Sequence, residues 1–205
     1  MPGHVPYKTL LKASGPFLLK ERKSKFLGWV FPARSPGEAA NQIDSLWKKY
    51  PDATHICYAY RIGVENPTVR VNDDGEPAYS AGAPIYNQIE SEQLFDVLLC
   101  VIRYYGGTKL GVGGLIQAYR EAARGVLEQA RVVNRVPVCK LTLDFEYPLL
   151  DAVMRFVSQH QLKLRSQRME LDCSLELEVP LERCEEIREG IQSLGSVKVR
   201  SETTY

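Results

Sequence analysis

The sequence lacks the features that would take it into or across a membrane. No stretch approaches the roughly 18 consecutive apolar residues of a membrane-spanning helix. Residues 1–6, MPGHVP, contain no basic segment followed by an apolar core, which a secretion signal would have. We therefore expect a cytoplasmic protein without a membrane partner.

The cysteines lack any pair spaced as Cys-x-x-Cys. The number is odd, and most of these residues lie in apolar or alternating runs, as buried free thiols do. This pattern argues against a disulfide framework or a zinc site. We expect no disulfide, no metal and no cofactor. The five residues are Cys57, Cys100, Cys139, Cys173 and Cys184.

A strong excess of charge of one sign is also missing, because the formal net charge is +1. The charge is nevertheless unevenly distributed. Residues 1–135 hold 17 Lys and Arg against 13 Asp and Glu, whereas residues 136–205 hold 9 against 12. The first part is mildly basic, far below a dedicated nucleic-acid-binding domain.

A chain of 205 residues accommodates two small domains, and we expect these at 1–135 and 138–205. The clearest signal in the first domain is a helix start. Ser35 can act as the cap, Pro36 suits the first helical position, and Glu38 completes a capping box. The predicted order is β-β-α-β-β-loop-β-α. Its strands are expected at Tyr7–Lys12, Lys25–Phe31, Thr54–Val64, Pro67–Val71 and Leu94–Arg103, and its two main helices after Ser35 and over Leu115–Val126. Within the loop, Gly82-Ala83-Pro84 can open a short additional helix.

Arg131–Pro137 reads as the joint between the domains. The second pattern is βαββαβ, which is typical of a ferredoxin-like domain. Its last long strand alternates cleanly, with Leu171, Cys173, Leu175, Leu177 and Val179 predicted to face inward. The expected fold class is α+β: a mixed sheet with two main helices, followed by the smaller ferredoxin-like domain.

A glycine-rich loop, 103–115, joins a buried strand to a helix, and it is the strongest candidate site. The start of a helix presents free N–H groups and a positive dipole end, which suit an anion. Alternatively, the glycines only allow the helix and sheet to pack closely. The residues predicted to bind an anion or nucleic acid are Arg103, Lys109, Gly113, Gly114, Arg120 and Arg124.

Known nucleotide-binding motifs do not fit this loop. A Walker loop requires Lys and Ser or Thr directly after its last glycine, but Val112 and Gly113 follow Gly111. A dinucleotide-binding fingerprint requires glycine where Ile116 stands.

Three acids, Asp73, Asp74 and Glu76, lie in a second loop rich in turn residues. They can form a structural turn, hold Mg²⁺, or act as general acid and base. His55 and Cys57 share one face of a predicted strand, which permits a thiol–imidazole pair, although such residues are usually only neighbours. The basic run Lys20–Lys25 is either a solvated face or a phosphate contact.

Two blocks of sequence together resemble the IMPACT (YigZ-like) family. Residues 72–77, NDDGEP, with 81–84, AGAP, resemble its first block. Residues 101–107, VIRYYGG, with 110–115, LGVGGL, and Ala118-Tyr119 match its second block. Two positions depart from the family pattern. Tyr79-Ser80 replaces a common Gly-Thr pair, and Gln117 stands where a basic residue is frequent.

The resemblance implies a first domain like the second domain of a small-subunit ribosomal protein. It implies a second domain like a ferredoxin-like domain of elongation factor G. Family members are linked to translational control, and eukaryotic members carry an extra N-terminal partner-binding domain that inhibits activation of a stress kinase. This chain begins directly with the family domain, so we expect that route to be absent. The resemblance transfers no catalytic residue.

We therefore expect a noncatalytic protein that contacts RNA, the ribosome or a translation factor. The alternative is an enzyme of small phosphorylated molecules or peptides that uses the glycine loop and the Asp73–Glu76 loop. A third interpretation is an adaptor whose acidic second domain meets a basic partner.

Overall fold

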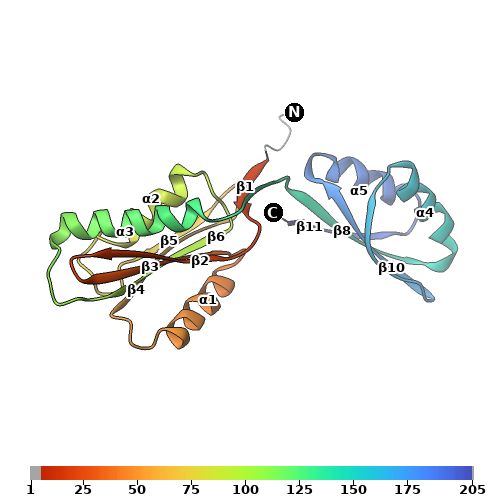
Figure 1. Ribbon diagram of the computed structural model, residues 1–205. Helices are drawn as coiled ribbons and strands as arrows, with labels where there is room; N and C mark the ends of the chain where they lie inside the picture. Colours follow the sequence, from red (N-terminus) through yellow and green to blue (C-terminus); the bar gives the residue numbers. More distant parts are fainter. Residues whose placement is uncertain (1–5, 205) are drawn as a thin grey trace. The chain divides into compact units, whose positions relative to one another are not determined.

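Residues 6–204 are described in the computed structural model, and their contacts divide the chain between Arg135 and Val136. The N-terminal unit, Tyr7–Arg135, is built on a five-stranded sheet in the order β2-β3-β6-β4-β5. Every pair in it is antiparallel, so the expectation of a mixed sheet is wrong for this unit. Two helices, α2 and α3, cover one face of this sheet, and α1 covers the other (Figure 1). The elements are β1 Tyr7–Leu10, β2 Ser14–Glu21, β3 Ser24–Pro32, α1 Pro36–Lys49, β4 His55–Ile62, β5 Thr68–Asn72, α2 Gly82–Ser91, β6 Val97–Tyr104, α3 Gly111–Glu128 and β7 Val132–Arg135.

The central strand β6 is buried from Val97 to Arg103, as its continuous apolar run predicts. It starts three residues later than expected, because the chain turns at Gln93 and Asp96, which both have positive φ angles. α1 begins as predicted, with the Ser35 Oγ accepting from the Glu38 N–H at 3.1 Å.

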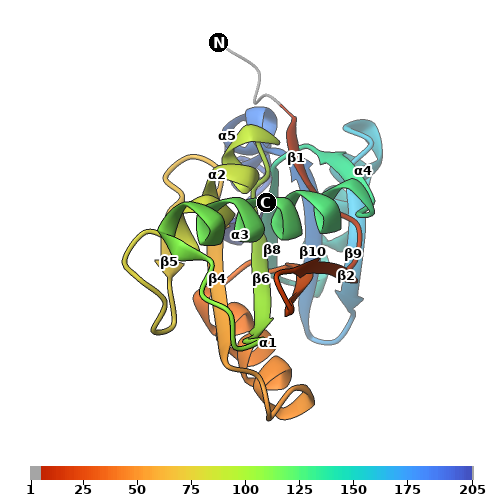
Figure 2. The same ribbon diagram turned by 60° about the vertical axis from the view of Figure 1, so that its left-hand side comes forward.

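α3 lies over β2, β3 and β6, which Figure 2 shows from a second direction. The helix comes so close to the sheet that a Cβ at Gly125 would lie 2.4 Å from the Phe17 ring. Tyr119, at the middle of α3, is fully buried and meets the Phe26 ring edge-on at 5.2 Å between centroids. The close packing brings the Tyr119 hydroxyl down to the sheet.

Residues 14–23 lie between two expected strands, Tyr7–Lys12 and Lys25–Phe31, and the sequence predicts no strand there. The structure corrects this, because they form β2 and the turn of a β2–β3 hairpin. Glu21 pairs with Ser24, and the two-residue turn between them is Arg22-Lys23, with φ angles of 41° and 69°. Such turns usually contain Gly, Asn or Asp, so the sequence carries no hairpin signal here. The segment expected to be a joint also contains a strand, because β7 pairs with β1.

The C-terminal unit, from Val136 onward, is an antiparallel sheet in the order β11-β8-β10-β9 with two helices on one face. This arrangement confirms the βαββαβ prediction. Leu171, predicted to face inward, precedes β10 and is 90% exposed, because the strand starts one residue later. The elements are β8 Val138–Glu146, a 3-10 turn Tyr147–Leu149, α4 Leu150–Gln159, β9 Lys163–Arg168, β10 Asp172–Pro180, a 3-10 turn Leu181–Arg183, α5 Cys184–Gln192 and β11 Lys198–Thr204.

The expectation of five free thiols is wrong for two of them. Cys139 of β8 and Cys184 of α5 form a disulfide, with their Cα atoms 5.8 Å apart. They are 45 residues apart in sequence and meet only because α5 packs on the sheet. The remaining three cysteines are free and buried. Among the described helices, none is long and apolar enough to cross a membrane.

Candidate functional site

The start of α3 presents open backbone donors beside an exposed cation. The helix begins at Gly111, and the residue before it, Leu110, makes no side-chain capping bond in the described chain. Gly111 and Gly113 are exposed, and so is Lys109 just before the helix. First-turn N–H groups have no partner within their own helix, so these donors face solvent.

Two arginines extend this basic surface along α3. Arg120 and Arg124 are exposed, and together with Gly113 they line a hollow of about 370 Å³. Acids also lie here, because Arg124 Nε is 3.4 Å from Glu128 Oε1 and Glu121 lines the same hollow. The structure therefore places four of the predicted residues on one helix and a fifth, Lys109, just before its start, and anion binding there stays a prediction. These five are Lys109, Gly113, Gly114, Arg120 and Arg124.

A second hollow, of about 350 Å³, lies beside Gly114 and is lined by Glu21, Arg22 and Glu121. Gln117, at the position where the family often has a basic residue, donates to Glu121 Oε1 at 3.0 Å. The carboxylates on this side of α3 oppose an anion, so the favourable approach is along Arg120 and Arg124.

Arg103 is not part of this surface, which corrects the sequence prediction. Its side chain is 6% exposed, and its Nη1 donates to Glu76 Oε1 at 2.5 Å. The alternation of β6 directs Arg103 toward the α3 side of the sheet, where Glu76 reaches in from the loop between β5 and α2. The positive charge of Arg103 is therefore compensated by Glu76 inside the protein.

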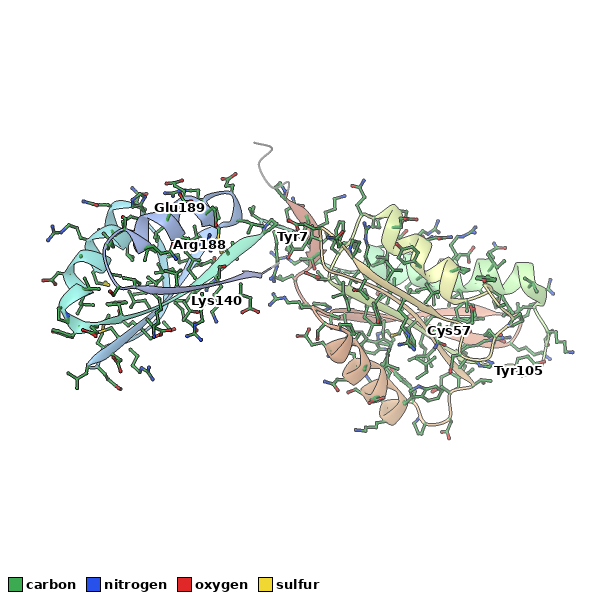
Figure 3. All side chains as sticks on the ribbon, turned by 180° about the vertical axis from the view of Figure 1, so that it is seen from behind. Tyr7, Cys57, Tyr105, Lys140, Arg188 and Glu189 are labelled. Atoms are coloured by element: carbon green, nitrogen blue, oxygen red, sulfur yellow. A yellow bond between two sulfur atoms is a disulfide. The ribbon has the colours of Figure 1, made fainter. Side chains whose placement is uncertain are left out.

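Glu76 is the centre of a buried polar group that we call the Glu76 cluster, formed by His55, Cys57, Glu76, Arg103 and Tyr119. The Tyr119 hydroxyl donates to Glu76 Oε1 at 2.8 Å, and the Cys57 thiol donates to the Tyr119 hydroxyl at 3.3 Å. His55 Nε2 lies 4.0 Å from the same carboxylate oxygen. Figure 3 labels Cys57 among the side chains at the sheet. Each member stands out in the sequence, but their association depends on tertiary packing.

The acids of the Asp73–Glu76 loop have three separate partners. Asp73 accepts from the backbone N–H groups of Tyr79, Ala81 and Gly82, so its charge lies at the start of α2. Asp74 accepts from the Ile56 N–H at 2.7 Å. With Glu76 turned toward Arg103, the three carboxylates do not converge on one point.

His55 and Cys57 both contact the same loop, and the Cys57 Sγ lies 3.1 Å from the Asp73 carbonyl oxygen. His55 Nδ1 lies 2.6 Å from the Asp74 carbonyl oxygen, which can only accept, so the ring donates from Nδ1. Burial raises the pKa of the Cys57 thiol. A thiol held in its neutral form is a poor nucleophile.

The glycine loop also holds the tip of the β2–β3 hairpin. A Cβ at Gly106 would lie 2.1 Å from the Lys23 backbone, and the Gly106 N–H donates to Ser24 Oγ at 3.2 Å. Tyr105 is thereby placed beside the hairpin lysines, and the tyrosine and the lysines line one hollow together. In the sequence, the basic run Lys20–Lys25 and the glycine loop are separate features, and nothing in their patterns predicts this contact.

Comparison with known proteins identifies the family. A family model described as the Impact N-terminal domain matches residues 22–127. The IMPACT family member YvyE of Bacillus subtilis is 32% identical over 155 residues, which cover 76% of this chain and 71% of that protein. The IMPACT family member YigZ of Escherichia coli is 31% identical over 140 residues, which cover 67% of this chain and 69% of that protein.

The similarity extends to a solved structure. A crystal structure described as that of a hypothetical protein has a TM-score of 0.73 and 26% identity to this chain. The match covers 95% of this chain and 96% of the other, so it includes both units. The family match at 22–127 contains both the Glu76 cluster and the glycine loop. On this evidence the chain belongs to the IMPACT family.

Proposed function

We propose that this IMPACT-family chain is a noncatalytic binding protein of the cytoplasm, linked to translation or its regulation. It contacts RNA, the ribosome or a translation factor through its N-terminal unit. The observation that carries the proposal is the basic surface along α3. It runs from Lys109 and the open N–H groups of Gly111–Gly114 at the start of the helix to Arg120 and Arg124 in its second half.

RNA is the partner whose chemistry fits these residues most directly. Arg120 and Arg124 are one helical turn apart and share a face, so they can contact successive phosphates. Lysine, arginine and helix-start N–H groups position a nucleic-acid backbone but do not read bases. Binding at this surface is therefore weak, salt-dependent and largely indifferent to sequence.

The C-terminal sheet supports assigning the contact to the N-terminal unit. The open face of that sheet pairs its charges internally, as in Lys140–Glu176 at 3.0 Å and Arg200–Asp144 at 2.7 Å. Cations engaged in this way have less charge to offer phosphates. The same holds for Arg124, which is paired with Glu128, so Lys109 and Arg120 carry most of the proposed contact.

The test is a titration of the intact chain with a labelled 20-nucleotide RNA at two salt concentrations. The double variant Lys109→Ala with Arg120→Ala should bind about tenfold more weakly at the lower salt, and its affinity should depend less on salt, because two phosphate contacts are lost. Arg70→Ala with Lys198→Ala removes the same charge from exposed positions elsewhere and should bind like the unchanged chain. Equal affinity of all three proteins would leave the α3 start as architecture, and no RNA binding by any of them would refute the proposed contact with RNA.

A further inference from the structure

The face of the N-terminal sheet opposite α3 carries a basic, aromatic hollow that the proposed function does not use. Its volume is about 550 Å³, within the range of ligand sites. Three lysines, Lys20, Lys23 and Lys25, line it together with Tyr104 and Tyr105. Leu18 and Leu27 form its apolar part.

The hollow exists because α1 ends before it covers this part of the sheet. Lys49, the last residue of α1, lies over Trp29 at 4.2 Å from the ring centroid, and the Trp29 Nε1–H donates to the Tyr50 hydroxyl at 3.2 Å. The preceding positions on the same face of β3 are Leu27 and Lys25, which lie beyond the end of the helix.

Strand register arranges the lining residues in rows. Lys20 of β2 is paired with Lys25 of β3, which is paired with Tyr104 of β6. The next row on the same face begins with Leu18 paired with Leu27. Directly opposed side chains on neighbouring strands lie about 5 Å apart, so the lysines and the tyrosine form one continuous surface.

The lysine pair has no stabilising role in the fold. Like charges directly opposite each other on paired strands are destabilising. No carboxylate is among the residues that line the hollow in the described chain. The nearest acid of the hairpin, Glu21, lines the separate hollow beside Gly114 and lies 3.9 Å from Arg22. Asp52 acts electrostatically on Tyr104 at the edge of the hollow, but the three lysines outnumber it, and this excess of positive charge suits an anionic partner.

The aromatic residues narrow the choice of anion. Tyr105 is 45% exposed at the end of the sheet, where Figure 3 labels it. The Arg103 guanidinium lies 5.3 Å from its ring centroid, on the buried side, and helps to fix the ring. An exposed ring beside lysines is the combination that binds unpaired nucleotides, with bases stacked on the ring and phosphates on the cations. A phosphate or an acidic peptide alone would use the lysines and leave Tyr105 without a role.

We propose that this hollow binds unpaired nucleotides of RNA, with a base stacked on Tyr105 and the flanking phosphates at Lys20, Lys23 and Lys25. The inference rests on the proposed RNA contact and adds a second, structurally separate surface that selects single strands. Duplex RNA keeps its bases stacked internally and gains nothing from the tyrosine.

The experiment compares a labelled ten-nucleotide oligouridine with an RNA duplex of the same length, each titrated into the intact chain at two salt concentrations. Tyr105→Ala should weaken binding of the single strand about tenfold and leave duplex binding and the salt dependence unchanged. Tyr105→Phe, which keeps the ring, should bind like the unchanged chain. Tyr147→Ala removes a tyrosine that is 59% exposed in the C-terminal unit and serves as the matched control.

Lys20→Ala with Lys25→Ala tests the charges separately from the ring. This variant should bind the single strand more weakly, with a logarithmic salt dependence shallower by about 1.4. Its melting temperature should stay the same or rise, because the repulsion between the paired lysines is removed. Arg70→Ala with Lys198→Ala is again the control of equal charge.

The outcomes separate the two proposals. If the unchanged chain binds the single strand and Tyr105→Ala binds it equally well, the hollow is not a nucleotide site, while the RNA contact at α3 stands. Unlabelled oligouridine and polyglutamate can also be compared as competitors for the labelled single strand. If both displace it equally well, the hollow binds acidic peptides and the inference is overturned. If the unchanged chain binds neither RNA, the RNA contact itself is wrong.

Discussion

A single carboxylate oxygen, Oε1 of Glu76, accepts hydrogen bonds from both the Arg103 guanidinium and the Tyr119 hydroxyl. Both charged side chains are almost fully buried, at 4% and 6% exposure. Removing one member of a buried pair leaves the other charge uncompensated, which is far more destabilising than losing an exposed pair. Arg103 already has one buried donor, Nε, without a partner among the described residues.

We predict that Glu76→Gln lowers the free energy of unfolding by about 3 kcal/mol, because the neutral amide cannot compensate the buried Arg103 charge. Urea unfolding followed by tryptophan emission measures this, since Trp29 and Trp47 are the two tryptophans of the chain and both lie in the N-terminal unit. The control is Glu90→Gln on the exposed surface of α2, which should change the value by less than about 0.5 kcal/mol. Equal midpoints for the two variants would show that the pair does not stabilise the fold.

At the scale of single residues, the sequence shows which side chains can do chemistry but not what each one contacts in the fold. Glu76, Arg103, His55 and Cys57 were all recognised as bearing chemistry. Arg103 was assigned to the surface because it stands beside the glycine loop in sequence. Its actual partner is 27 residues away, and only the packing of β4, β6 and α3 brings the two together.

At the scale of elements, the glycines of the loop divide into two kinds. Gly106 meets the hairpin backbone, where no side chain fits. Gly113 lies in the first turn of α3 with nothing within 4 Å of a Cβ placed there. The two interpretations of the loop, architecture and binding, therefore apply to different glycines.

This division predicts opposite effects of the same substitution. Gly106→Ala should lower the free energy of unfolding by about 3 kcal/mol, because the added methyl group overlaps the Lys23 backbone. Gly113→Ala should raise it by roughly 0.5 to 1 kcal/mol, because alanine loses less conformational freedom in a helix. Urea unfolding of both variants checks the pair, and a loss of stability in Gly113→Ala comparable to that in Gly106→Ala would contradict it.

Elements with a strong periodic or capping signal were predicted, and those without one were missed. Alternation identified β4 and β10, and the capping box identified α1. β2 was missed because Gly15 and Pro16 interrupt its pattern and its turn, Arg22-Lys23, contains none of the usual turn residues. Without β2, the opposed pair Lys20 and Lys25 could not be predicted either, since these two lysines share a face only when β2 and β3 are paired.

At the scale of the whole molecule, the two units respond differently to pH. In the N-terminal unit, burial raises the pKa of Tyr7 to about 12 and also raises the pKa values of Cys57 and Tyr119. In the C-terminal unit the shifted groups are carboxylates with lowered pKa values. A hydrogen bond from Ser174 lowers that of Asp144, and one from Lys140 lowers that of Glu176. Carboxylates of this kind contribute stability that is lost only in acid.

We therefore predict that alkali destabilises the N-terminal unit first. A phenol whose folded-state pKa exceeds its ordinary value of 10 contributes stability that is fully present below about pH 10 and is lost as the pH rises toward 12. Urea unfolding of the intact chain at pH 8 and pH 11 tests this, with tryptophan emission reporting the N-terminal unit alone and far-ultraviolet circular dichroism reporting both units. The midpoint seen by tryptophan should fall markedly at pH 11. The C-terminal unit has no tryptophan, so its unfolding appears only in the dichroism. The urea midpoint of that additional transition should shift less between the two pH values, because the ion pairs on the C-terminal sheet are largely exposed and contribute little stability. A tryptophan midpoint that stays constant between the two pH values would show that the buried tyrosines do not control the alkaline stability of this unit.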